Sequence, residues 1–314
     1  MMAGFKEERH PIDWREMIVM TLNMNVSPLR ICRGTSQRVV ALAIAFVIVT
    51  VTGCAMTFGY RHADWLLRWQ LDHYLDLNSA QRRDVTARLQ PLLSRHRAEA
   101  LPQYEQLLGE VQQRVRRGLT REDVEWVYAT YDRMRADLFE RAAPDGAALI
   151  TTITDKQIRN FEEVVRKEEQ QAARRLQTPA SARLNERAKT ILSLVEEWAG
   201  PVSAAQAAQI RQWSISLPDT QPAWWDYRRH RHQELVTLMR RGAPANEAAQ
   251  ALRAMFVTPE KSAPRAYLDS VKDLRSGLMT LLLGIDRSLT PVQRLKLIGS
   301  LQKLIEDIHA LRAG

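Results

Sequence analysis

A helix-start signal that occurs five times constrains the fold of this chain more than any other feature. Each copy has an apolar residue, then an Asn, Thr or Ser, and then an acidic or amide residue three positions later. In such a capping box, the cap oxygen accepts a hydrogen bond from the backbone N–H at the third helical position, whose side chain reaches back to the cap N–H. The signal predicts a helix after each box. The boxes are Asn78–Gln81, Thr120–Asp123, Thr154–Gln157, Ser203–Gln206 and Thr290–Gln293.

Apolar residues recur at steps of three and four along nearly the whole chain from residue 64 onward. This period predicts an all-α fold, an elongated multi-helix bundle of roughly eight to ten helices. Pro91 and Pro102 lie inside the pattern from 85 to 115, so one long helix or two, with a kink or break near either proline, is expected there. Only residues 148–154 (ALITTIT) look strand-like, and a lone strand forms no sheet. The other expected helices span 64–77, 121–142, 155–176, 181–199, 204–217, 222–241, 245–257, 264–286 and 291–312.

An apolar run from residue 39 to residue 51 precedes the helical region. As a helix it would cover roughly 20 Å, which is short of the roughly 30 Å hydrocarbon core of a bilayer. Arg30, Arg33 and Arg38 come before or at its start, with no acidic residue among them. A basic region followed by a short apolar region is typical of a signal peptide, so we expect removal of this segment instead of a stable span.

The sequence Val-Thr-Gly-Cys that ends at Cys54 resembles the lipobox of bacterial lipoproteins. The resemblance implies cleavage between Gly53 and Cys54, with lipid attached to the Cys54 thiol and to the new N-terminus. It divides the chain into a signal peptide, 1–53, and a periplasmic all-helical domain, 54–314. Ala55 after the cysteine, instead of Asp, implies sorting to the outer membrane. The alternative is an uncleaved anchor with an incidental cysteine, which would tether the same domain on the same side of the membrane.

The basic region begins late for a signal peptide, so we expect translation to start at Met20 or Met24, with the earlier residues an artefact of the gene model. The chain has two cysteines, Cys32 and Cys54, and only Cys54 remains after cleavage. No disulfide and no cysteine-based metal site or nucleophile is then expected. Apart from the covalent lipid on Cys54, no cofactor is predicted.

The net charge of +9 permits contact with anionic lipid or an acidic polymer. Residues 1–53 contain six basic and four acidic residues, so the mature chain keeps +9 − 2 = +7. The 45 basic and 36 acidic residues are interleaved, as on solvated helix faces. The expected partners are the membrane, through the anchor, and an envelope protein or anionic polymer. Nucleic acid is not expected, because chromosomal DNA is absent from the periplasm.

The stretch WWDYRRHRHQELV combines aromatic and basic side chains, which can stack on rings and hold anionic groups. An alternative is that the aromatic residues pack into the bundle while the arginines remain in solvent. His230 and His232 are two residues apart and point to different helix faces, so no metal clamp is predicted. The candidate binding surface consists of Trp224, Trp225, Tyr227, Arg228, Arg229 and Arg231.

The sequence contains no Gly-rich phosphate loop, nucleophile elbow or His-Glu-x-x-His zinc helix. A binding, scaffold or chaperone-like role is therefore favoured, with no catalytic residue assigned. The alternative is an enzyme acting on peptidoglycan or lipid, with a site formed between helices. That alternative predicts that Asp72, His73, His96 and Glu197 converge in a buried cleft.

Residues 54 to about 115 resemble a family of uncharacterised proteobacterial lipoproteins, a domain of unknown function. The resemblance rests on Cys54, a Trp-rich first helix at 64–77, NSAQ at 78–81 and RHRAEALPQYEQLL at 95–108. It implies a location and an all-helical fold but no activity. The recurring boxes also resemble the Leu-Thr-x-x-Gln motifs of Spy- and Cpx-type periplasmic chaperones, which are helical cradles that hold unfolded clients. The alternative is that any well-capped helical protein shows such boxes.

Overall fold

The computed structural model describes residues 59–313, which form α-helices, one π-helix and one 3-10 helix, with no strand within this range. The predicted all-α, multi-helix fold is confirmed for this part of the chain. Gly53 and Cys54, the predicted cleavage and lipidation residues, lie outside the described residues.

Eleven α-helices run through the described part, close to the expected number. The first half contains α3 (Ala63–Leu75), α4 (Ser79–Arg95), the π-helix η1 (His96–Ala100), α5 (Leu101–Arg117), α6 (Arg121–Ile150) and α7 (Asp155–Leu176). The second half contains α8 (Ala180–Ala199), α9 (Ala204–Ser216), α10 (Gln221–Arg240), α11 (Ala245–Phe256), the 3-10 helix η2 (Pro259–Lys261), α12 (Arg265–Ser288) and α13 (Pro291–Ala313).

Two stretches differ in detail from the sequence-based expectation. Helix α6 runs to Ile150, so the first part of the strand-like stretch 148–154 is the last turn of this helix. Near Pro102, the helix does not break but widens to a π-helical turn. There the N–H of Leu101 bonds to the carbonyl of His96, five residues earlier. A proline has no N–H and its ring crowds the carbonyl four residues earlier, so the wider π turn accommodates Pro102 at the start of α5.

All five capping boxes form. Four are complete boxes at the starts of α4, α6, α7 and α9. At the start of α13, Thr290 N–H donates to Gln293 Oε1 at 2.9 Å and Gln293 N–H donates to Thr290 Oγ1 at 3.2 Å. The start of each of these five helices is therefore determined by a few neighbouring residues in the sequence.

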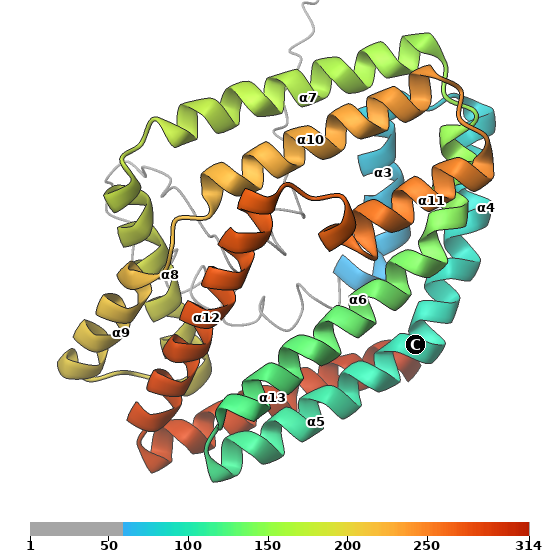
Figure 1. Ribbon diagram of the computed structural model, residues 1–314. Helices are drawn as coiled ribbons and strands as arrows, with labels where there is room; N and C mark the ends of the chain where they lie inside the picture. Colours follow the sequence, from blue (N-terminus) through green and yellow to red (C-terminus); the bar gives the residue numbers. More distant parts are fainter. Residues whose placement is uncertain (1–58, 314) are drawn as a thin grey trace, which may run out of the picture.

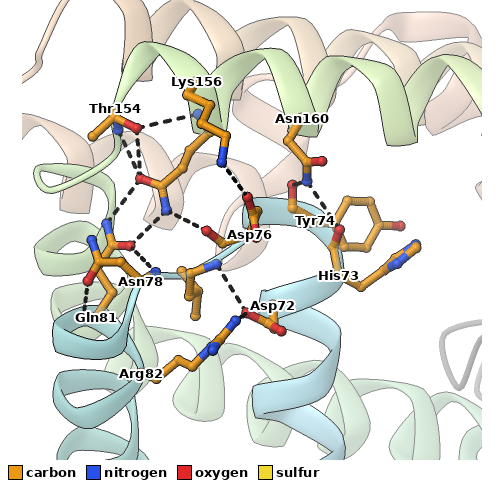
Figure 2. A network of polar contacts seen from close by, with 12 residues as sticks. Asp72, His73, Tyr74, Asp76, Asn78, Gln81, Arg82, Thr154, Lys156 and Asn160 are labelled. Carbon is orange, nitrogen blue, oxygen red and sulfur yellow. Dashed lines mark hydrogen bonds and ion pairs between the residues drawn. The ribbon is translucent and has the colours of Figure 1, made fainter.

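Two of these boxes meet and form a reciprocal glutamine pair, here called the N-terminal clasp (Figure 2). Gln157 Nε2 donates to Gln81 Oε1 at 2.7 Å, and Gln81 Nε2 donates to Gln157 Oε1 at 3.2 Å. Gln81 Nε2 also donates to the Thr152 carbonyl at 2.9 Å, and Gln157 Nε2 to the Asp76 carbonyl at 3.2 Å. Each amide oxygen also accepts from the N–H of its own cap residue. Every donor and acceptor of both buried amides is used.

The other two glutamine boxes repeat this arrangement as the C-terminal clasp. Gln206 Nε2 donates to Gln293 Oε1 at 2.9 Å, and Gln293 Nε2 donates to Gln206 Oε1 at 3.2 Å. Their remaining N–H groups bind the carbonyls of Ser288 and Pro201, both at 2.7 Å. Each clasp therefore joins two helix–helix connections that are distant in sequence.

The fifth box contains Asp123 instead of glutamine, and it has no glutamine partner in the described structure. A carboxylate cannot donate, so Asp123 instead accepts from Arg117 at 2.6 Å and lies 3.1 Å from Arg114 Nε. Burial raises the pKa of Asp123, but the hydrogen bonds from the Thr120 N–H and the Arg117 guanidinium outweigh this effect and hold the pKa below its usual value. The adjoining turn is fixed by Asp286, which accepts from the Leu119 N–H at 2.9 Å.

The two clasps organise two halves of similar topology. In the first half, α3 packs on α4 and α7, and α4 packs on α6; in the second half, α8 packs on α9 and α13, and α9 packs on α12. The halves also exchange contacts, because α5 packs on α13 and α10 packs on α7. Figure 1 shows the result as a ring of helices, with α7 and α10 along one side and α5 and α13 along the opposite side.

The largest hydrophobic cluster surrounds the N-terminal clasp and includes Tyr74, Leu77, Ile158 and Phe161. Smaller clusters join α6 to α10 and α11, α5 to α13, and α6 to α12. Close approach of α9 and α12 requires Gly284, because a Cβ atom there would lie 2.7 Å from the Trp213 ring. The apolar core is thus distributed around the ring in several clusters.

We expect Gln81→Glu to destabilise the fold by about 2 kcal/mol, because the carboxylate loses both N–H donors and faces the Thr152 carbonyl and Gln157. Gln90→Glu, at an exposed position of the same helix, is the matched control and should change the free energy of unfolding by less than about 0.5 kcal/mol. Urea unfolding followed by circular dichroism measures both. Equal stability of the two variants would show that the clasp contributes nothing.

Candidate functional site

The predicted binding surface lies on α10, and its residues point in different directions. Trp224, Trp225 and Arg231 are half-buried, and Arg229 is exposed. The other two, Tyr227 and Arg228, are buried, at 4% exposure each. The stretch therefore divides into a part that faces α7 and α3 and a part that faces α11 and α12.

Arg228 anchors the first part inside the protein. Its Nη2 lies 2.7 Å from Glu168 Oε2 on α7 and 3.1 Å from the Tyr74 hydroxyl on α3, and Tyr74 donates a hydrogen bond to Glu168. The guanidinium also lies over the rings of Trp224 and Trp225, at 5.4 and 5.1 Å from their centroids. Arg228 is thus buried and paired with internal partners, so it does not present its charge to solvent.

A small cavity opens beside this ion pair, between α7 and α10. It is lined by Glu168, Ala172, Trp225, Arg228 and His232, among others, and its volume is about 60 Å³. Small-molecule pockets usually exceed about 300 Å³. The cavity therefore has room for water molecules but not for a metabolite.

The second part of the stretch belongs to a larger group of arginines and tyrosines. Tyr227 stacks on Tyr267 of α12 with ring centroids 4.1 Å apart, and its hydroxyl donates to the Met255 carbonyl. Arg231 lies over the rings of Tyr227 and Phe256, at 4.8 and 5.2 Å. Helices α6 and α12 add further members. The arginine–tyrosine cluster consists of Arg135, Arg231, Arg275, Tyr131, Tyr227 and Tyr267.

The electrostatics of the cluster follow from its three guanidinium groups. Burial raises the pKa of Tyr267, and the positive charges of Arg231, Arg135 and Arg275 oppose that rise. Arg275 makes a bidentate contact with Asp132 at 2.7 and 2.8 Å, and Arg135 donates to the Phe256 carbonyl. The cluster remains partly open to solvent, since Tyr131 is 50% exposed.

A second cavity lies beside the π-helix. There His96 bridges two tyrosines: Tyr60 Oη lies 3.0 Å from its Nδ1 and Tyr104 Oη lies 3.2 Å from its Nε2. Burial lowers the pKa of His96, which favours the neutral ring. The cavity volume is about 20 Å³, enough for about one water molecule. This site is a structural junction in which both imidazole nitrogens have partners.

The four residues whose convergence would indicate an enzyme are divided among three elements, with Asp72 and His73 adjacent on α3. Asp72 accepts from the Leu77 N–H and from Arg82 beside the N-terminal clasp (Figure 2). His73 is exposed on α3, His96 belongs to η1, and Glu197 is exposed on α8. Of the four, only His96 lines the cavity beside the π-helix, and none lines the cavity between α7 and α10. Among residues 59–313, no group of His, Cys, Asp or Glu is arranged to hold a metal ion.

Sequence reasoning missed most of the arginine–tyrosine cluster. Tyr227 and Arg231 were singled out because they lie within one conspicuous stretch. Arg135, Arg275 and Tyr267 lie on other helices, in segments whose local composition is ordinary. Only the packing of α10 on α12, and of α12 on α6, brings these residues together.

We expect Glu168→Gln to destabilise the protein by about 2 kcal/mol, because it leaves the buried Arg228 guanidinium without its counter-charge. The cost is below that of a fully buried pair, since Glu168 is 22% exposed. Glu169→Gln is the matched control, because its contact with the exposed Arg229 is 3.7 Å long and should contribute less than about 0.5 kcal/mol. Chemical unfolding compares the two. A larger effect of the Glu169 change would contradict the assignment of Arg228 as the anchor.

Comparison with known proteins gives one family and no further relative. No curated protein and no solved structure matches the chain. A family of unknown function, DUF6279, matches residues 73–267, which is more than half of the chain. Membership of a family of unknown function is thereby confirmed. The matched range begins at residue 73, after Cys54, Trp65 and Trp69, so the lipoprotein part of the expected resemblance stays a prediction. The match includes the whole N-terminal clasp and all of α10. The chain therefore belongs to DUF6279, a family of unknown function.

Proposed function

We propose that this protein is a lipoprotein of the bacterial outer membrane, attached through Cys54 and facing the periplasm, that holds another envelope protein or an anionic polymer. The anchor is supported by the basic flank, the short apolar run and the Gly53-Cys54 sequence. No helix between residues 59 and 313 is long and apolar enough to cross a bilayer. The role is that of a scaffold or chaperone-like binding protein.

The observation that carries the binding role is the arginine–tyrosine cluster. Among the charged groups that act on Tyr227, Tyr267 and Arg275, three are arginines and two, Asp132 and Glu234, are carboxylates, so the arginines are in excess. Tyrosine and arginine are enriched at the energetic centres of protein interfaces, because they supply a large rigid contact area together with hydrogen-bond donors. The partial exposure of Tyr131 and Arg275, 50% and 40%, leaves this chemistry open to a partner.

The anchor is tested by Cys54→Ala, which should abolish incorporation of labelled palmitate and release the protein from the membrane fraction in flotation, because no acyl chain can then be attached. Cys32→Ala is the matched control and should label and float like the wild type. A Cys54→Ala protein that still incorporates palmitate would show that the anchor lies elsewhere.

The binding role is tested by a photocrosslinking amino acid placed at Tyr131 in the intact cell envelope. We expect an adduct with a discrete envelope component, and we expect Arg275→Gln to weaken it, because that change removes one positive charge of the cluster. The same crosslinker at Glu197, which is exposed on α8, is the control. Equal adducts at both positions, or none at Tyr131, would contradict a partner at the cluster.

A further inference from the structure

Helix α3 carries a row of aromatic rings along one side. Trp65 and Trp69 stack with ring centroids 6.5 Å apart and an interplanar angle of 20°, and Trp69 stacks on His73 at 5.8 Å and 10°. Trp65 is 56% exposed, an unusual state for the largest apolar side chain. The three residues follow at steps of four, so they form one continuous strip on the helix surface.

Trp65 faces away from the core, whereas Trp69 is half-buried and the His73 ring contacts that of the buried Tyr74. The buried residues of α3 are Gln70, Tyr74 and Leu75, of which Tyr74 and Leu75 belong to the hydrophobic cluster around the N-terminal clasp. At about 100° per residue, Trp65 lies about 180° around the helix from Tyr74, and Trp69 lies about 140° from it. Packing within the described fold therefore does not account for an indole at position 65.

The position of α3 relative to Cys54 limits what the strip can meet. Five residue steps separate Cys54 from Gly59, so their Cα atoms lie no more than about 18 Å apart. The six steps from Gly59 to Trp65 are almost entirely helical and add only about 9 Å. Trp65 is therefore within roughly 27 Å of an acylated Cys54, a reach that permits contact with the membrane surface.

Charges beside the strip suit a phospholipid surface. Arg61 is exposed, and Arg68 lies on the same flank of the helix, paired with Asp64 at 2.8 Å. Basic residues next to a membrane are attracted to anionic head groups. Tryptophan is enriched at the level of the head groups, because its ring is apolar and its indole N–H finds a polar partner there.

We propose that the Trp65–Trp69 strip of α3 lies in the head-group region of the phospholipid layer that holds the acyl chains of Cys54. This inference rests on the proposed anchor and adds an orientation to it: the outer face of α3 is turned to the membrane. The acyl chains supply the attachment, and the strip holds the first helix against the surface.

The test uses the full lipidated protein in vesicles of phosphatidylethanolamine and phosphatidylglycerol that carry bromine near the head groups, which quenches nearby tryptophan fluorescence. The wild type should be quenched, and the double variant with Trp65→Phe and Trp69→Phe should lose most of this quenching. The matched control combines Trp126→Phe and Trp198→Phe, both half-buried, and should retain it. Flotation of each sample with the vesicles reports the anchor separately.

The outcomes separate the two proposals. Protein that floats but is quenched equally in all variants retains its anchor and overturns the membrane contact of α3. Protein that does not float overturns the anchor and, with it, the contact. If the Trp65 and Trp69 changes instead shift the oligomeric state in light scattering without altering quenching, the strip binds a second copy of the chain and the lipid assignment is wrong.

Discussion

Two reciprocal glutamine pairs are the constraint on which the rest of the structure depends. Each lies where two helix–helix connections meet, and buried connections contain backbone groups that need hydrogen-bond partners. A carboxamide has two donors and an oxygen that accepts twice, so Gln81 caps its own helix, binds the opposite connection and pairs with Gln157 at the same time. Aspartate has no donor, and the corner at Asp123 recruits arginines instead. The residue at the third helical position of each box thus decides whether that corner closes through a glutamine pair or through arginines.

The exchange of helices between the halves makes the two clasps interdependent. Helix α5 of the first half packs on α13, which begins at the C-terminal clasp, and α10 of the second half packs on α7, which begins at the N-terminal clasp. Neither half buries the apolar faces of these helices alone. Opening one corner would therefore expose apolar surface in both halves, so we regard the described helices as one cooperative unit.

Features that depend on neighbouring residues could be predicted from the sequence, whereas contacts between residues far apart in the chain could not. Capping chemistry is contained in four residues, and each helix begins directly after the cap residue of its box, at Ser79, Arg121, Asp155, Ala204 and Pro291. The glutamine pairs join positions 76 and 87 residues apart, and nothing in a box specifies its partner. The stretch on α10 was recognised as unusual, but the division of its side chains between two neighbouring layers depends on residues of α7 and α12. Pro102 predicted a kink or break in the helix, but the sequence did not indicate that the irregularity would be a π-helix.

Helix α10 connects the two surfaces to which we assign roles. Arg228 fixes it to Tyr74 of α3 and Glu168 of α7, while Arg231, one turn further, belongs to the arginine–tyrosine cluster. The helix that would lie on the membrane and the cluster that would hold a partner are therefore joined by one rigid element and a buried ion pair, not by a loop. A partner bound at the cluster would have a defined orientation relative to the membrane, as a scaffold requires and as a flexibly tethered domain would not provide.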